Sequence, residues 1–448
     1  MNLDAFAVEV SRGAMTRLAA GPAALDELSV LCRRLAGPGE RVLLTDDVPK
    51  QADGRDLIAW VGELIGAHRH LVVRPTHTQV TLDEATIEST LASAGSPGLI
   101  ISLGSGTITD LGKVVSARSG APLVAVQTAA SVNGFSDPLS VLVIGGAKRT
   151  RPSAWPAALV IDDRVVDAAP AHLNRSGVGD AIAIWSAPAD WYLACALGMD
   201  GPFIEAAVHP VLDAVEGLAD PDPDVARTAL IESLTVGGLV IGVADSTAPL
   251  SGSEHLTSHI LDMTAMARGV EHDLHGAQVG VATVVCTALW QEVRATSDVF
   301  DRPWGNLHYP ADLEERVRST WAALDPSGSL GDECWTAVAR KVAAWEASDK
   351  DACDSSRPEL LDRLFGYVGT PERSAATLQR WGAATRFSEL QPPVGRDQLI
   401  WTLLALPYMR DRLTLPDLLV MTGEWTAELI ERVLARSSAA VDRGHSEF

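Results

Sequence analysis

Histidines concentrate in one stretch of the chain with a spacing that suits a metal ion. Four of the eleven histidines fall within the 21 residues from His255 to His275. His255 and His259 are four residues apart, so a helix would place both rings on one face, where imidazole nitrogens can ligate a metal. A lone pair of this kind is more often structural than ligating. The addition of His275, together with a carboxylate elsewhere in the chain, favours the metal site.

The best carboxylate for such a site is Asp180, within Gly177-Val178-Gly179-Asp180-Ala181-Ile182. An acid at the start of an otherwise apolar helix also has a simpler role, as a cap or as a partner of the helix dipole. One carboxylate, two imidazoles and an open coordination position, however, suit a Lewis-acid metal that polarises a carbonyl or stabilises an alkoxide. Zinc or ferrous iron would fit.

A glycine-containing loop indicates a second kind of ligand. GSGTITDLGK, residues 104–113, follows the apolar run 99–103 and leads into a helix-compatible stretch. Glycines at a strand-to-helix turn let backbone N–H groups approach a ligand, and the amino end of the helix favours an anion such as a pyrophosphate. The loop matches neither GxGxxG nor a Walker loop, and similar turns occur in α/β proteins that bind nothing there.

Polar residues follow two further predicted strands. The segment 127–136, QTAASVNGFS, comes directly after the apolar run 123–126. Because the carboxyl ends of parallel strands share one edge, this segment and the glycine loop would line one cleft. Asp46 follows the run 41–45, where an acidic side chain can accept hydrogen bonds from a ribose and so favour NAD over NADP. An Asx-type turn explains this aspartate equally well.

Elements that would position these residues follow from the hydrophobic pattern. Short β-branched runs alternate with helical patterns up to about residue 165, which predicts a parallel sheet with helices on both faces. The predicted strands are 41–45, 71–74, 98–103, 123–126 and 141–144, and the first four are separated by helices near 22–36, 52–67, 82–93 and 107–119. From about residue 168 apolar residues recur at helical spacing. We therefore expect an α/β domain over residues 1–166 and a helical domain over residues 167–448, with an insertion around residues 296–377.

Composition and charge argue against several classes of function. The chain has 448 residues, is 47% hydrophobic and carries a net charge of −22, so it can bury a large core but lacks the basic surface that nucleic acid requires. Five scattered cysteines without CxxC spacing indicate reduced thiols. The Met1 end shows no secretory pattern, and no uncharged apolar stretch of about 18 residues occurs. We expect a cytoplasmic protein that binds no nucleic acid and has no membrane span.

Together these motifs resemble those of the sn-glycerol-1-phosphate dehydrogenase family. That family belongs with the iron-containing alcohol dehydrogenases, glycerol dehydrogenase and dehydroquinate synthase. The resemblance covers roughly residues 5–295 and 378–430, with the motifs in the expected order. The motifs are GSGTITDLGK, QTAASVNGFSD, SGVGDAIA, SGSEHLTSH, LHGAQVGVAT and, at residues 409–415, MRDRLTL.

The resemblance implies the dehydroquinate synthase-like fold, an amino-terminal Rossmann-like nucleotide-binding domain and an all-α carboxy-terminal domain with cofactor, metal and substrate held between them. The implied metal ligands are Asp180, His255 and His275, with His259 around the ligands or on the substrate side. The implied cofactor contacts are Gly104, Ser105, Gly106 and Thr107 at the pyrophosphate, Asp110 and Lys113 near the nicotinamide, and Thr128 and Ser131 along the cofactor.

The chemistry that the resemblance implies is reversible hydride transfer between NAD(H) or NADP(H) and a small ketone or polyol, such as the pair dihydroxyacetone phosphate and sn-glycerol 1-phosphate. A divalent metal, Zn²⁺ with Fe²⁺ or Ni²⁺ as alternatives, would withdraw electron density from the carbonyl oxygen. Lys148 and Arg149, with Arg151, form the densest basic run near the loops and are candidates to receive a substrate phosphate. A solvated hairpin end explains this run equally well. The family also implies a homodimer.

Three features depart from the family pattern. Asn133 stands where the family has an aspartate near the reacting centre, and an amide is uncharged and donates as well as accepts hydrogen bonds, so the substrate or the proton relay would differ. Thr109 replaces the usual Asn of the glycine loop. The insertion around residues 296–377 matches the family poorly and is a candidate cap or subunit contact. It contains Trp304, Trp321, Trp335 and Trp345.

Two other functions stay open at this point. A dehydroquinate-synthase-like cyclase also uses nicotinamide and a metal but returns its cofactor oxidised. Asp180 in place of the glutamate expected there, together with the SGSEH motif, argues against it. A noncatalytic binding protein that retains the fold is the other alternative, and the retained metal ligands weigh against that one.

Overall fold

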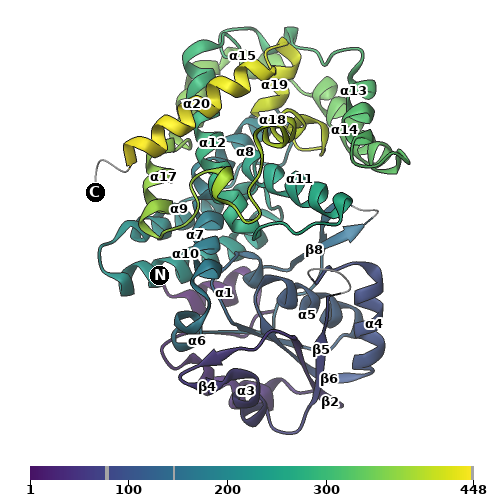
Figure 1. The fold of residues 1–448 in the computed structure, drawn as a ribbon, viewed down its shortest axis with the longest axis vertical. Coiled ribbons are helices and arrows are strands. Elements are labelled where there is room, and N and C mark those ends of the chain that lie inside the picture. Colours follow the sequence, from purple (N-terminus) through teal and green to yellow (C-terminus); the bar gives the residue numbers. More distant parts are fainter. Residues whose placement is uncertain (76–79, 145–146, 445–448) are drawn as a thin grey trace. The chain divides into compact units, whose positions relative to one another are not determined.

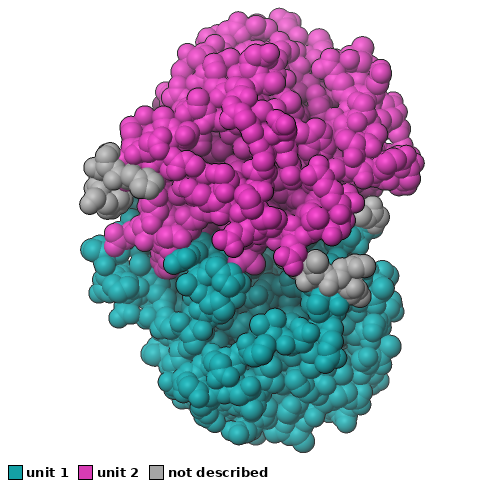
Figure 2. All heavy atoms as spheres, viewed as in Figure 1, with its two compact units in different colours: residues 1–177, 213–245 teal, residues 178–212, 246–448 magenta. Residues whose placement is uncertain are grey.

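The computed structural model describes residues 1–75, 80–144 and 147–444. The chain divides into two compact units, coloured separately in Figure 2: residues 1–177 with 213–245, and residues 178–212 with 246–448. The division predicted at residue 166 remains a prediction. The first boundary between the two units falls later, after Gly177, and the segment 213–245 belongs to the first unit.

The first unit is built on a six-stranded sheet in which every strand pair is parallel (Figure 1). In spatial order its strands are β1 (Arg17–Gly21), β10 (Ala158–Asp162), β7 (Leu123–Gln127), β6 (Pro97–Gly104), β2 (Glu40–Asp46) and β5 (Arg69–Val73). The predicted parallel sheet is therefore present, with four of its five predicted strands. Strands β1 and β10 extend it at one edge and were not predicted.

Helices cover both faces of this sheet because successive strand side chains point to opposite sides. Leu43 packs with α2 (Leu28–Leu35) and α3 (Leu57–Ile65) in one buried cluster. Its neighbour Leu44 packs with α4 (Glu84–Ala94) and α5 (Gly106–Ser119) in the other. The predicted two-sided arrangement is confirmed.

Two predicted elements differ in detail. The predicted strand 141–144 lies in β8 (Leu139–Ile144), which pairs antiparallel with β9 (Ala147–Pro152) in a separate hairpin. The connection between them is far shorter than the dozen or more residues that a parallel crossover needs. The predicted helix 52–67 begins only at Leu57, where the Asp56 carboxylate caps it by accepting from Ala59 N at 2.8 Å.

One helix of the first unit is long and apolar enough to cross a membrane by length and composition. This helix, α10 (Pro223–Ala244), has 72% of its most apolar window buried within the protein. The Ser136 hydroxyl donates to the Thr235 carbonyl of α10 at 2.8 Å. This burial and this hydrogen bond are typical of a core helix.

The second unit is helical, as predicted, and the insertion contributes to its core. Within the insertion, α13 (Leu313–Ala322), α14 (Ser329–Ala347), α15 (Lys350–Ser355) and α16 (Arg357–Gly366) form in sequence. Three of the four insertion tryptophans are buried, and their indole N–H groups donate to the backbone carbonyls of Val299, Tyr408 and Leu307. Since these rings are core residues, they offer no surface for a cap or a subunit contact.

Candidate metal centre and cofactor loops

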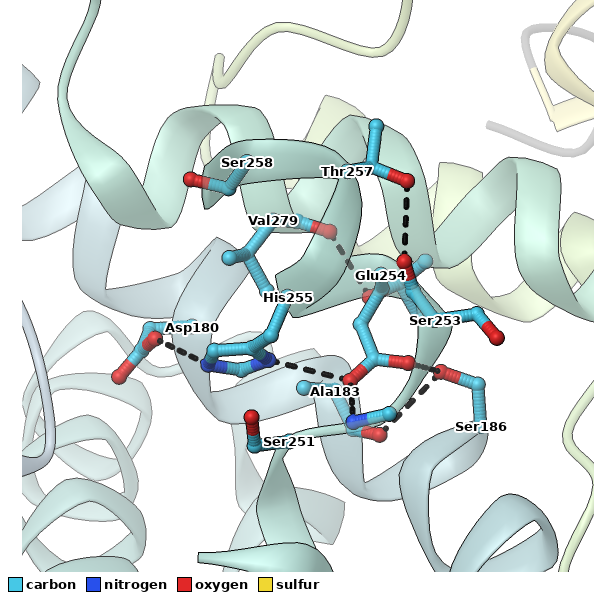
Figure 3. Close-up of polar contacts among 12 residues, drawn as sticks. Asp180, Ala183, Ser186, Ser251, Ser253, Glu254, His255, Thr257, Ser258 and Val279 are labelled. Carbon is cyan, nitrogen blue, oxygen red and sulfur yellow. Dashed lines mark hydrogen bonds and ion pairs between the residues drawn. The ribbon is translucent and has the colours of Figure 1, made fainter. Parts of the chain in front are cut away.

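The structure brings Asp180, His255 and His275 together inside the second unit. One carboxylate oxygen and one imidazole nitrogen from each histidine lie within 4.8 Å of one another. Asp180 Oδ1 is 3.4 Å from His255 Nε2 and 3.8 Å from His275 Nε2. Figure 3 shows the Asp180 carboxylate facing the His255 ring. Three donors of the types that zinc and ferrous iron accept therefore converge on one place.

Glycines explain why two of these residues can meet. Asp180 lies in the last turn of α7 (Ala171–Ala181), and His275 is the first residue of α12 (His275–Thr296). A Cβ on Gly179 would lie 2.0 Å from the carbonyl oxygen of Gly276, and one on Gly280 would lie 2.7 Å from Gly179 Cα. Only glycines permit this approach of α7 to α12, so the glycines of SGVGDAIA and LHGAQVGVAT set the distance between Asp180 and His275.

Glu254 fixes the orientation of the His255 ring. Its fully buried carboxylate lies 3.0 Å from His255 Nδ1, and it accepts hydrogen bonds from Ser186 Oγ at 2.7 Å and Gly252 N at 2.6 Å (Figure 3). A carboxylate only accepts, so Nδ1 donates its proton to Glu254, and Nε2 is the nitrogen that faces Asp180 and would ligate a metal ion. His255 lies in the first turn of α11 (Ser253–Arg268), directly after this glutamate.

The hydroxyl of Ser258 fixes the orientation of the His275 ring in the same way. Ser258 Oγ donates to Gln278 Oε1 at 2.7 Å and lies 2.8 Å from His275 Nδ1. Because the single hydroxyl proton goes to Gln278, the serine oxygen accepts from Nδ1–H, and His275 Nε2 also faces Asp180. Both rings thus present the same nitrogen to the carboxylate.

Charge at this place favours a cation. Burial by itself lowers the pKa of the His255 imidazole, but Asp180 and Glu254 outweigh burial and raise that pKa to about 9. Two buried carboxylates therefore surround one imidazole, and a bound divalent cation would balance their charge.

Some residues of this site escaped the sequence-based prediction. Glu254 lies in the SGSEH motif, but no role was predicted for it. Its position next to His255 is the signal in the sequence that it could orient a metal-binding histidine. Ser258 and Gln278 carry no such signal, because their contact with His275 joins two helices. His259, predicted around the ligands, is buried with its ring centroid 5.4 Å from that of His275, outside the group of three converging donors.

The glycine loop lies in the first unit where β6 gives way to α5, as predicted. A Cβ on Gly104 would lie 2.5 Å from Ile108 Cβ, and one on Gly106 would lie 2.7 Å from Val132 Cγ2. Close packing within the protein therefore explains why both positions are glycine. Ser105 is half-buried as the N-cap residue of α5, and Thr107 is exposed in its first turn. Contact of these four residues with a pyrophosphate stays a prediction.

Lys113 has an internal role, and its predicted place near the nicotinamide stays a prediction. Its side chain is 0% exposed, and Nζ lies 2.8 Å from Asp110 Oδ1 and 2.9 Å from Asp137 Oδ1. The same ammonium donates to the carbonyls of Gly134, at 2.6 Å, and Leu139. Burial alone would lower the pKa of Lys113, but the two carboxylates outweigh it and raise that pKa. Lys113 therefore ties α5 to the segment 134–139.

The second polar loop packs against the start of α7. Asn174 Oδ1 accepts from Ala130 N at 3.0 Å, and Ser176 Oγ donates to the Ser131 carbonyl at 3.3 Å. Ser131 is buried, whereas Thr128 and Asn133 are half-buried. The Asn133 carbonyl, at the N-terminal end of a short 3₁₀ turn, accepts from Ser136.

The remaining predicted contacts occupy the ends of strands. Asp46 ends β2, accepts from Val48 N at 2.9 Å and pairs with Lys50, so its local role is that of an Asx turn and ion pair. Lys148 is half-buried and Arg149 is buried on β9. Their assignment to a substrate phosphate is untested.

Comparisons with known proteins agree with this geometry. A family model for iron-containing alcohol dehydrogenases matches residues 19–170. The glycerol-1-phosphate dehydrogenase [NAD(P)+] of Bacillus licheniformis is 31% identical over 59% of this chain, and the match spans 62% of that enzyme. That of Hyperthermus butylicus is 30% identical over 62% of this chain and 76% of the relative.

The fold has solved counterparts. Glycerol dehydrogenase from Schizosaccharomyces pombe superposes with a TM-score of 0.57 at 15% identity, covering 95% of this chain and 90% of that one. This likeness confirms the predicted fold class, an α/β part followed by a helical part. The chain therefore belongs to the glycerol-1-phosphate dehydrogenases, within the iron-containing alcohol dehydrogenases.

Proposed function

We propose that the chain interconverts a small phosphorylated ketone and its secondary alcohol, with dihydroxyacetone phosphate and sn-glycerol 1-phosphate as the first pair to test. As a member of its family the chain is an NAD(P)-dependent, metal-containing alcohol dehydrogenase. The observation that carries the proposal is the convergence of Asp180, His255 and His275 within 4.8 Å of one another. Asn133, where the family has an aspartate, keeps a related polyol phosphate as the second substrate to test.

The donor set fits a divalent cation. One carboxylate and two imidazoles, each imidazole with Nδ1 hydrogen-bonded to a partner, leave a carboxylate oxygen and two Nε2 atoms as ligands. We propose Zn²⁺ as the ion, with Fe²⁺ and Ni²⁺ as the alternatives, because nitrogen and oxygen donors without a cysteine suit all three. When bound, the ion would supply Lewis acidity at the substrate oxygen.

The protein residues have distinct parts in this chemistry. Asp180 supplies negative charge at the converging nitrogens, and Glu254 and Ser258 hold the protons of His255 and His275 on Nδ1. Bound reduced nicotinamide would supply the hydride for the carbonyl carbon, and a proton from solvent would complete the alcohol. Because no covalent nucleophile is needed, the rings only have to stay in place during turnover. We further propose a cytoplasmic homodimer, on the family resemblance.

The test is oxidation of NADH and of NADPH by the purified, metal-loaded protein with dihydroxyacetone phosphate, beside His255→Ala. The expected result is stoichiometric consumption of one or both cofactors that the variant loses. Stoichiometry also excludes the cyclase, which returns its nicotinamide oxidised. A protein that binds metal and nicotinamide yet turns over neither dihydroxyacetone phosphate nor other small ketones and polyol phosphates would overturn the proposal.

A further inference from the structure

Arg412, in the MRDRLTL segment, lies at the start of the helix that carries His255. Its Nη1 donates to the carbonyl oxygen of Ser251, and its Nη2 donates to Thr247 Oγ1 at 3.0 Å. Ser251 precedes His255 by four residues, and Figure 3 shows it beside the His255 ring. The guanidinium is thus anchored to the segment 247–251, which directly precedes the helix that carries His255.

A buried carboxylate holds the two chain segments together at this point. Asp190, on α8 (Ala187–Ala196), accepts from Leu415 N at 2.9 Å with one oxygen. With the other it accepts from Ser253 N at 2.9 Å and from Ser253 Oγ at 2.8 Å. Burial raises the pKa of Asp190 to about 7, against the lowering effect of these hydrogen bonds. The segment that bears Arg412 is therefore fixed to the first residue of α11, and the guanidinium is held in place before any ligand arrives.

Arg412 has no counter-ion among the residues that the structure describes. No carboxylate oxygen of residues 1–75, 80–144 or 147–444 lies within 4.0 Å of its nitrogens. The adjacent Asp411 turns to Arg340 instead, at 3.1 Å. Burial lowers the pKa of Arg412, although the more distant carboxylates of Asp200, Asp411, Glu254 and Asp190 act in the opposite direction. By contrast Arg357, half-buried in the same unit, is paired with Asp354.

The guanidinium also has donors to spare. It carries five N–H groups in a planar fork, and the described protein acceptors are two neutral oxygens, on Ser251 and Thr247. A half-buried cation whose partners are neutral is costly unless an anion completes the site. Phosphate oxygens match the fork geometry of arginine and form charge-assisted hydrogen bonds with it.

We propose that Arg412 binds the phosphate group of the substrate and so places the carbonyl carbon near His255 and Asp180. This inference rests on the proposed function, because it names the group by which that site would select its substrate. It also differs from the sequence-based assignment of the phosphate to Lys148 and Arg149. A purely structural alternative is that Arg412 only fastens the segment 247–251.

The experiment compares Arg412→Met and Arg412→Lys with the wild type in the full-length, metal-loaded protein. Arg340→Met is the matched control, since it removes an exposed guanidinium that pairs with the neighbouring Asp411. Each protein is assayed with dihydroxyacetone phosphate and with dihydroxyacetone, which lacks the phosphate. The thermal unfolding of each is also followed with and without inorganic phosphate, a readout that needs no turnover.

The expected result is a fall in kcat/KM for dihydroxyacetone phosphate of about 10- to 100-fold in Arg412→Met, carried mainly by KM. Activity with dihydroxyacetone should fall much less than activity with dihydroxyacetone phosphate, because that ketone has no phosphate for Arg412 to bind. Arg412→Lys should keep part of the preference because it retains the charge without the fork. Inorganic phosphate should raise the unfolding temperature of the wild type and of Arg340→Met but not of Arg412→Met.

Failure of the inference and failure of the proposed function give different results. Equal losses on both substrates, with the phosphate response intact, would show that Arg412 is a structural anchor and overturn the inference alone. A wild type that turns over no ketone overturns the proposed function, and the phosphate response then decides by itself whether Arg412 is an anion site. If Arg412→Met does not fold, Arg412→Lys is compared with the wild type instead, and a partial loss confined to dihydroxyacetone phosphate is expected; equal losses on both substrates would overturn the inference.

Discussion

Glu254 Oε1 lies 3.0 Å from His255 Nδ1, the ring nitrogen that faces away from Asp180. The glutamate is held in turn by the Ser186 hydroxyl and the Gly252 N–H. A carboxylate at this place makes the imidazole a better electron donor and prevents the ring from turning.

Glu254→Gln should weaken the binding of a divalent cation by about 10- to 100-fold, because an amide supplies no charge and can present its N–H to Nδ1. The measurement is titration of chelator-stripped protein with Co²⁺, followed by its visible absorption. Glu292→Gln is the control: Glu292 is also buried but pairs with Arg432 and Arg436. An unchanged Co²⁺ affinity and spectrum in Glu254→Gln would show that the glutamate does not position the ring.

Removal of the cation should lower the unfolding temperature. An ion that binds only the folded state at 100 times its Kd adds about 2.7 kcal/mol to the free energy of unfolding. Thermal unfolding with chelator, and again after Zn²⁺ or Fe²⁺ is restored, measures the effect. Asp180→Asn, which removes the charged oxygen between the two imidazoles, should respond weakly or not at all. A full response in that variant would place the stabilising ion elsewhere.

Lys113→Met should destabilise the protein by about 3–5 kcal/mol, since it leaves the buried Asp137 and the half-buried Asp110 without their cation. Urea unfolding measures this loss. Arg118→Met tests the same helix at an exposed position, where solvent screens the ion pairs with Glu84 and Glu88 and the loss of stability should be much smaller. If Lys113→Met kept full stability but lost nicotinamide binding, the lysine would be a cofactor contact after all.

The carboxyl of Asp137 should make stability depend on pH. Burial raises its pKa to about 6, although Lys113 acts to lower it. In the unfolded chain the pKa of Asp137 is near 3.9, so the folded state binds more protons than the unfolded state between about pH 4 and pH 6. The stability that this proton binding adds is full below that window and is lost as pH rises through 6. The stability of the wild type relative to Asp137→Asn should fall by about 2 kcal/mol between about pH 4.5 and pH 7.5 in urea titrations. A constant or rising difference would contradict the assignment.

The sequence by itself determined the layered first unit and the identity of the converging residues. Buried parallel strands must be continuous apolar runs, so the runs that became β2, β5, β6 and β7 were legible without a structure. The run Ala158-Leu159-Val160-Ile161 has the same character and should have been predicted as β10. Strand β1, Arg17–Gly21, gives little signal because it is short, lies at the edge and has no β-branched residue.

Only the tertiary structure decided how the polar residues are partnered. The pattern of Asp110 and Lys113 in the sequence does not reveal that the segment 134–139 supplies Asp137 as a second ion-pair partner of the lysine. Likewise, no local pattern shows that Ser258 meets His275, or that Arg412 meets Ser251 with no carboxylate nearby among the described residues. Hydrophobic periodicity is a local property of the chain and can be read from neighbours, whereas the partner of a buried charge is set by segments distant in sequence.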